Sequence, residues 1–210
     1  MPYGRFNRVK KQLVDRPNAM RGGRLRPVAS TGFTVIELLV VISILALLTG
    51  IFLPALAKMR QVATKGSCMS NLRQIGTALQ SYQDTHRSNY PRARYMPDPF
   101  VTIFLEDPSL TEVLADEMDV RSQVYACPGD TGQVHARTGI SYTYNASLSG
   151  QKLEESWFVR RIKFNASEVP VAYDCDGNTF YLQDGSQMTV APFHLLRNLL
   201  FADSHVGNYQ

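Results

Sequence analysis

The hydrophobic pattern of the chain is dominated by one apolar run between Phe33 and Ala57. These 25 residues contain a single charge, Glu37, and a single proline, Pro54. A helix rises about 1.5 Å per residue, so the run covers about 38 Å and exceeds the roughly 30 Å hydrocarbon core of a bilayer. The apolar side chains outweigh one carboxylate, which costs about 3 kcal/mol in a span. We therefore predict a membrane-spanning helix over residues 33–57.

Polarity returns after this run while the helical spacing of apolar residues continues. The apolar positions recur every three, four or seven residues, at Val62, Met69, Leu72, Ile75, Leu79 and Tyr82. Such a stripe is typical of one helix face packed on a domain. We predict one helix from about Phe33 to about Thr85, whose second half, residues 58–86, is amphipathic. A bend is expected at Gly50 and Pro54, because proline has no amide hydrogen to donate to the carbonyl four residues earlier.

The remaining residues, 87–210, show short apolar segments separated by turn-forming residues. Few helices and several short strands predict an α+β fold, with the long helix packed on a small antiparallel-sheet head. The expected elements are strands at 124–127, 140–145, 169–173 and 199–202, a helix at 109–118, a strand or buried turn at 100–105, and a strand or helix at 157–164. The chain would then consist of segments 1–32, 33–57, 58–86 and 87–210.

Charge is distributed unevenly along the chain. Residues 1–32 hold eight Lys/Arg and one Asp, a charge of +7, whereas the rest holds 14 basic and 17 acidic residues, a charge of −3. Basic residues just before a span keep that end in the cytoplasm, so the head is expected in the periplasm. The basic character belongs to the leading segment, and we therefore expect no nucleic-acid partner. Met20 is a second candidate start, alongside Met1.

Three cysteines, Cys68, Cys127 and Cys175, would lie in this oxidising compartment. Two of them could form a disulfide, or all three could be buried thiols, and spacing does not determine the pairing. None forms a C-x-x-C motif, so no zinc site is expected.

Gly32-Phe33-Thr34-Val35-Ile36-Glu37-Leu38, followed by the apolar run, resembles the processing motif of type IV prepilins and type II secretion pseudopilins. The resemblance implies that a prepilin peptidase cuts after Gly32 and methylates the new amine of Phe33. It also implies that Glu37 is the assembly carboxylate and that Pro54 occupies the kink position. Thr31 stands where the family often has Lys or Arg. Independently of the resemblance, this cut would place a cation four residues from Glu37, within one subunit or across to its neighbour.

Further motifs are similar to a prepilin-like family that ends in a signature of His, nine residues and Asp-Gly. In this chain, eight residues separate His194 from Asp203, and Ser204 replaces the glycine, where a left-handed turn is expected. The matching segments are Cys68–Gly76, Tyr90-Pro91, Cys127-Pro128-Gly129-Asp130 and Ser141-Tyr142-Thr143-Tyr144-Asn145.

Candidate chemistry in the head is sparse. Asp174 and Asp176 are candidate calcium ligands, with an Asp-Gly turn as the other interpretation. His194, Asp203 and His205 could form a metal or acid–base cluster, or simply a polar turn. No nucleophile motif or phosphate loop is present, so no enzymatic activity and no cofactor are expected.

The sequence thus predicts a structural subunit that is processed after Gly32 and assembled from the inner membrane into a pilus or a secretion pseudopilus. Its expected partners are the prepilin peptidase, other pilin or pseudopilin subunits, and membrane lipid. The alternative is a membrane-anchored periplasmic domain that binds a ligand or cargo and does not polymerise. Two further interpretations of the apolar run are an uncut anchor and a signal peptide cleaved after Ala57.

Overall fold

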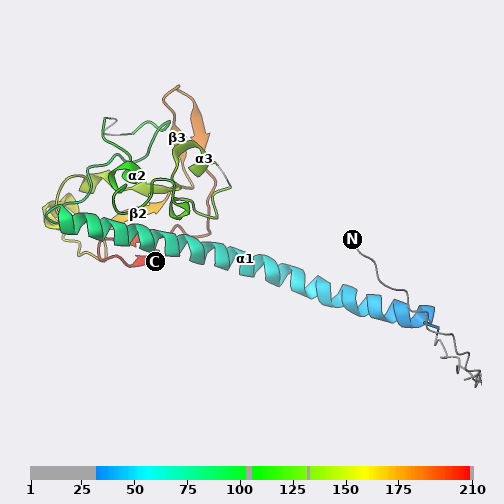
Figure 1. The fold of residues 1–210 in the computed structure, drawn as a ribbon. Helices are drawn as coiled ribbons and strands as arrows, with labels where there is room; N and C mark the ends of the chain where they lie inside the picture. The colour runs from blue at the N-terminus through cyan, green and yellow to red at the C-terminus, as the bar shows by residue number, and fades with distance from the viewer. Residues whose placement is uncertain (1–31, 103–105, 132, 209–210) are drawn as a thin grey trace, which may run out of the picture. The chain divides into compact units, whose positions relative to one another are not determined.

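The structure is a computed structural model that describes residues 32–102, 106–131 and 133–208 (Figure 1). The predicted leader, except for Gly32, and both candidate start sites lie outside the described residues. The chain divides into two units, Met1–Ala46 and Leu47–Gln210. The long helix α1, Val35–Thr85, is 51 residues long and begins in the first unit. It confirms the predicted helix and its carboxyl-terminal end.

The first part of α1 is an apolar helix whose side chains are not buried by the described chain. It is long and apolar enough to cross a membrane. The helix is continuous through Pro54, which lies inside it. The predicted bend at Gly50 and Pro54 stays a prediction.

The second part of α1 packs on the head, as the amphipathic stripe predicts (Figure 1). Val62 was expected on this face, but its side chain is 72% exposed. The first residue of α1 that is buried in the core is Cys68, six residues after Val62. At Gly76 an added Cβ would lie 2.9 Å from Cδ1 of Leu200, so glycine lets α1 approach the sheet closely. The buried residues of α1 are Cys68, Leu72, Ile75, Gly76, Ala78 and Leu79.

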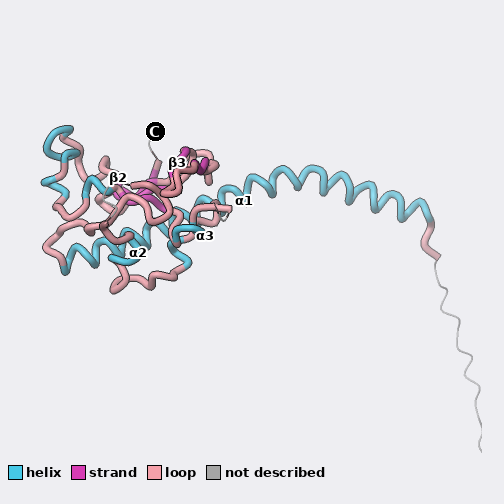
Figure 2. The backbone as a smooth tube through the Cα atoms, turned by 90° about the horizontal axis from the view of Figure 1, so that it is seen from above, coloured by secondary structure: helices cyan, strands magenta, loops and turns pink. Residues whose placement is uncertain are grey.

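The head contains a four-stranded antiparallel sheet, which confirms the α+β class (Figure 2). Its strand order is β1-β2-β5-β6. The register pairs Thr143 with Tyr173 and Ala172 with Leu200. The strands are β1 Tyr142–Tyr144, β2 Pro170–Asp174, β5 Leu199–Phe201 and β6 Val206–Gly207. Three of the expected strand regions are therefore confirmed.

A second, two-stranded antiparallel sheet was not predicted. It consists of β3, Thr179–Tyr181, and β4, Gln187–Thr189. Along each three-residue strand the side chains alternate between exposed and half-buried, and none is fully buried, so the hydrophobic pattern of this segment is weak. Near it, Phe100 forms an isolated bridge with Leu182, while 103–105 lie outside the described residues.

Short helical turns connect these strands and correct two predictions. The expected helix at 109–118 is only α2, Leu110–Val113, which begins with a capping box between Ser109 and Glu112. The expected strand at 124–127 is wrong, because this region begins with the 3₁₀ turn η1, Gln123–Tyr125. The segment 157–164, predicted as a strand or a helix, contains the π-helical turn η4, Phe158–Ile162. The other short elements are α3 His135–Thr138 and the 3₁₀ turns η2 Ala146–Leu148 and η3 Leu153–Glu155.

Candidate functional site

The predicted processing site lies just before α1. Phe33 precedes the helix in non-helical backbone, and its side chain is 72% exposed. Gly32 is exposed as well. The Gly32–Phe33 bond is therefore not protected by helical hydrogen bonds or by packing within the described chain.

Thr34 and Glu37 form a reciprocal capping box at the start of α1. The backbone amide of Glu37 donates to Oγ1 of Thr34 at 3.2 Å. In return, Oε2 of Glu37 accepts from the amide of Thr34 at 2.9 Å and from its hydroxyl at 2.7 Å. This arrangement satisfies amide groups that a helix start leaves without helical partners. Glu37 therefore has a local capping role in addition to the predicted pairing with the amine of Phe33, and the pattern Thr-x-x-Glu is a recognisable signal for it.

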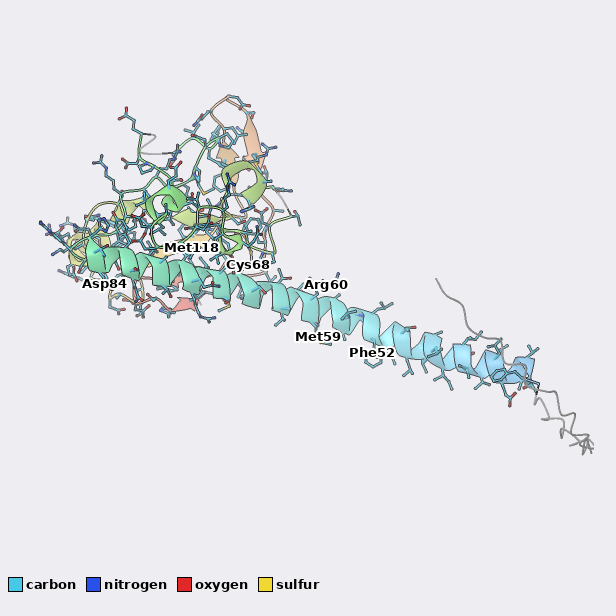
Figure 3. The ribbon with its side chains drawn as sticks, viewed as in Figure 1. Phe52, Met59, Arg60, Cys68, Asp84 and Met118 are labelled. Carbon is cyan, nitrogen blue, oxygen red and sulfur yellow. A yellow bond between two sulfur atoms is a disulfide. The ribbon has the colours of Figure 1, made fainter. Side chains whose placement is uncertain are left out.

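A disulfide joins α1 to the head at Cys68 and Cys127 (Figure 3 labels Cys68). Their Cα atoms are 5.1 Å apart, and 59 positions separate them in the sequence. This is one of the pairings that the sequence left open. Beside the bridge, the side-chain amide of Asn71 donates to the carbonyl of Ala126 at 2.9 Å. Cys175 is a buried free thiol, and burial raises its pKa to about 12.

The Cys127-Pro128-Gly129-Asp130 motif wraps around one sulfur atom. Sγ of Cys127 accepts a hydrogen bond from the amide of Gly129 at 3.4 Å and lies 3.3 Å from Nε2 of His194. A Cβ on Gly129 would lie 2.9 Å from Cε1 of His194 and 2.9 Å from the carbonyl oxygen of Phe193. Only glycine leaves room for the histidine there.

Asp130 closes the same motif by accepting several hydrogen bonds. Its Oδ1 accepts from the amides of Gln133 and Val134 at 2.9 and 3.2 Å. Its Oδ2 accepts from the amide of His135 at 2.7 Å and from the hydroxyl of Ser141 at 2.8 Å. Asp130 thus connects the Cys127–Asp130 motif to Ser141, which immediately precedes β1.

His194 lies between the disulfide and a buried carboxylate. Its Nε2 is 4.0 Å from Oδ2 of Asp174, a residue at the end of β2 with no exposed surface. The same Oδ2 accepts from the amide of Asn198 at 2.8 Å, while Oδ1 has no hydrogen-bond partner among the described residues. Burial raises the pKa of Asp174 to about 7 and lowers the pKa of His194.

Asp176, the second calcium candidate, is engaged by other protein groups. Its Oδ1 accepts from Nε of Arg197 at 3.0 Å, and its Oδ2 accepts from the amide of Phe193 at 2.7 Å. A calcium ion at Asp176 would have to compete with the Arg197 guanidinium. Asp174 and Asp176 therefore position the segment that carries His194.

Asp203 and His205 interact with each other across the β5–β6 turn. Nδ1 of His205 is 2.5 Å from Oδ1 of Asp203. Between them Ser204 has a φ of 70°, which confirms the left-handed turn expected at this position. Asp203 and His205 thus form the polar turn that was the other interpretation. The contacts of His194 described above are with Cys127 and Asp174 instead.

No curated protein and no solved structure matches the chain. A family model matches the second half of α1, the Cys127–Asp130 motif and β1, and the matched region ends before His194. Over residues 57–155 the chain is similar to a family described as a protein of unknown function (DUF1559).

Proposed function

We propose that this protein is a pilin-like subunit, held in the inner membrane by α1, cut after Gly32, methylated at Phe33, and assembled into a pilus or secretion pseudopilus. The observation that carries the proposal is the start of α1. The exposed Gly32–Phe33 bond is followed by the capping box of Thr34 and Glu37, which begins a helix with exposed apolar side chains. The region similar to the DUF1559 family, residues 57–155, contains the Cys68–Gly76, Cys127–Asp130 and Ser141–Asn145 segments whose sequence resembles prepilin-like proteins.

The apolar half of α1 exposes hydrophobic side chains that no other part of the described chain buries. Its large side chains are exposed along this half of the helix, for example 82% at Val35 and 67% at Leu47. Lipid can cover such a helix, and so can the same helix of neighbouring subunits. On assembly, the contacts of this helix with lipid would be replaced by contacts with the same helix of neighbouring subunits, while the heads remain outside the helix bundle.

The capping box keeps its form when the leader is removed. Both of its residues, Thr34 and Glu37, follow the cut, and cleavage adds a cationic amine at Phe33. The carboxylate of Glu37 would then stabilise the helix start in its own subunit and attract the amine of a neighbour in a low-dielectric environment. Removing residues 1–32 also removes the +7 charge that holds the amino terminus at the cytoplasmic face.

The disulfide supports the proposed location of the head. Bridges of this kind persist in oxidising compartments such as the periplasm and are rare in the cytosol. A single span with a basic segment before it would place Cys68 and Cys127 on the periplasmic side.

Two substitutions separate the capping role of Glu37 from its charge. Glutamine can replace glutamate in a capping box but carries no charge, so Glu37→Gln keeps the cap, whereas Glu37→Ala removes both. We expect both variants to insert in the membrane and to be cleaved, and both to be depleted from sheared filaments. Mass spectrometry of the amino terminus, searching for methyl-Phe33, reports cleavage.

Normal filament incorporation of Glu37→Gln would refute the charge-pairing role and leave only the cap. Thr34→Val is the matched control, because it removes the capping hydroxyl and keeps the carboxylate. An uncut amino terminus on protein from its own cells would refute processing. A cut protein that binds a ligand through its head and never enters filaments would favour the anchored binding domain.

A further inference from the structure

Three side chains that bind soft and borderline metal ions meet where α1 joins the head. The donor atoms of Cys68, Cys127 and His194 all lie within 4.8 Å of one another, and all three residues are buried. Donors around one tetrahedral Zn²⁺ stand roughly 3.3–3.8 Å apart, since Zn–S is about 2.3 Å and Zn–N about 2.1 Å. The 3.3 Å between Cys127 Sγ and His194 Nε2 already has this value.

A backbone amide and an open space beside Cys127 suit a metal ligand. The amide of Gly129 donates to the sulfur at 3.4 Å. The absent side chain of Gly129 lets His194 approach this sulfur. Hydrogen bonds from outer groups are what orient metal ligands in proteins.

A carboxylate lies on the other side of His194. Oδ2 of Asp174 is 4.0 Å from Nε2 of His194. It is not one of the three donors that all lie within 4.8 Å of one another, so it would have to move toward the two sulfur atoms to become a ligand. Oδ1 of this fully buried carboxylate has no hydrogen-bond partner among the described residues. A buried carboxylate with an unused oxygen is costly unless a cation or a proton is supplied.

From this arrangement we propose that the dithiol form of the chain binds Zn²⁺ through Cys68, Cys127 and His194, with Asp174 as the fourth ligand. The disulfide and the metal site are alternative states of the same two cysteines. A chain whose cysteines have not yet been oxidised holds both thiols, and binding one Zn²⁺ releases the two thiol protons. Starting from the disulfide, a dithiol reductant gives two electrons and two protons to the bridge and itself becomes a disulfide.

The proposal explains why a zinc site was not expected from sequence. Its ligands come from α1, from the turn after η1, from the end of β2 and from the loop before β5, so no short C-x-x-C motif exists. The metal would hold α1 to the head at the point where the disulfide holds it after oxidation.

The test uses the full chain in detergent micelles, reduced with a phosphine that is then removed without oxygen, and titrated with Co²⁺ as a spectroscopic probe for Zn²⁺. We expect thiolate-to-Co²⁺ charge-transfer absorption, the intense visible bands of a tetrahedral site, a stoichiometry of one, and loss of these bands on adding Zn²⁺. The air-oxidised chain should give none of these bands, because its sulfurs are bonded to each other.

Variants identify the ligands. Cys127→Ser should weaken the charge-transfer band, because one thiolate remains, and the double variant Cys68→Ser, Cys127→Ser should abolish it. His194→Ala should weaken Co²⁺ binding at least tenfold, with His194→Asn as a second variant if the alanine variant does not fold. Cys175→Ser is the matched control and should leave the spectrum unchanged, since its thiol belongs to a separate apolar cluster. Bands absent from the reduced wild type, a charge-transfer band that survives in the double variant Cys68→Ser, Cys127→Ser, or bands lost in Cys175→Ser would each overturn the proposal.

Discussion

Removing the Cys68–Cys127 disulfide should cost a large part of the stability of the head. The bridge connects residues 59 positions apart, one on α1 and one after η1. In the chain-entropy account, closing a loop of this length lowers the entropy of the unfolded chain by an amount worth about 4 kcal/mol at 25 °C. Domains are typically stable by about 5–15 kcal/mol, so the loss is between about a quarter and most of the stability of a typical domain.

The measurement compares oxidised and reduced wild-type chain in urea, with a chelator present so that no metal replaces the bridge. Near-ultraviolet circular dichroism is the suitable signal, because the buried rings of Tyr125, Tyr142 and Tyr144 belong to the head core. The apolar part of α1 contributes none of these rings, so its behaviour in detergent does not obscure the transition. We expect the free energy of unfolding to fall by about 4 kcal/mol on reduction.

The double variant Cys68→Ala, Cys127→Ala provides the second arm of the experiment. It should lose about the same amount plus a smaller contribution from the two buried sulfur atoms. Cys175→Ala keeps the bridge and controls for the loss of one buried sulfur. A loss below about 1 kcal/mol on reduction would refute the reasoning. It would mean either that α1 and the head remain associated in the unfolded state or that the bridge does not form.

Two further predictions concern single backbone positions. Gly129→Ala should destabilise the head by about 1–3 kcal/mol, since the new Cβ would lie 2.9 Å from His194 and from the backbone of Phe193; thermal unfolding measures this, and Gly66→Ala, with open space around its Cβ, should be neutral or stabilising. Ser204→Gly should stabilise the β5–β6 turn by roughly 0.5–1 kcal/mol, because relief of left-handed strain exceeds the added entropy of the unfolded chain. Unchanged stability in Gly129→Ala, or a loss in Ser204→Gly, would contradict these assignments.

The elements predicted correctly from sequence are those whose burial follows a regular period. The second half of α1 buries Leu72, Ile75 and Leu79, which recur at helical spacing. Strand β5 is buried along its length, and β2 is buried at three of its five positions; both come from short apolar segments. Where one face or most of a segment is buried in this way, the spacing of apolar residues in the sequence is sufficient to predict the helix or strand.

The predictions failed where local hydrogen bonds determine the backbone. Tyr125 and Cys127 alternate like strand residues and are both buried, yet the hydroxyl of Ser122 caps the amide of Val124 and begins a 3₁₀ turn. The β3–β4 hairpin escaped prediction because it carries few buried side chains. Its turn at Gly185, with a φ of 82°, was the available signal.

The contacts of the head cluster were beyond sequence reasoning for a different reason. His194 and Cys127 are 67 positions apart, and nothing in the chain between them indicates that they meet. The processing motif, in contrast, is local. Gly32, Phe33 and Glu37 lie within six residues, so one short segment predicts the whole constellation, and Thr34 was the only partner overlooked.

The motifs that suggested a prepilin-like family share one structural task in the head. Cys68 on α1 is bonded to Cys127, Asp130 of the same turn holds Ser141, and His194 packs against Cys127. Segments far apart in sequence thus converge on the face of α1 that enters the core. Under the proposed function, a subunit extracted from the membrane carries load along α1, and that load reaches the head through this junction. A covalent bridge at Cys68, placed where the helix meets the core, is the arrangement that resists separation of the two.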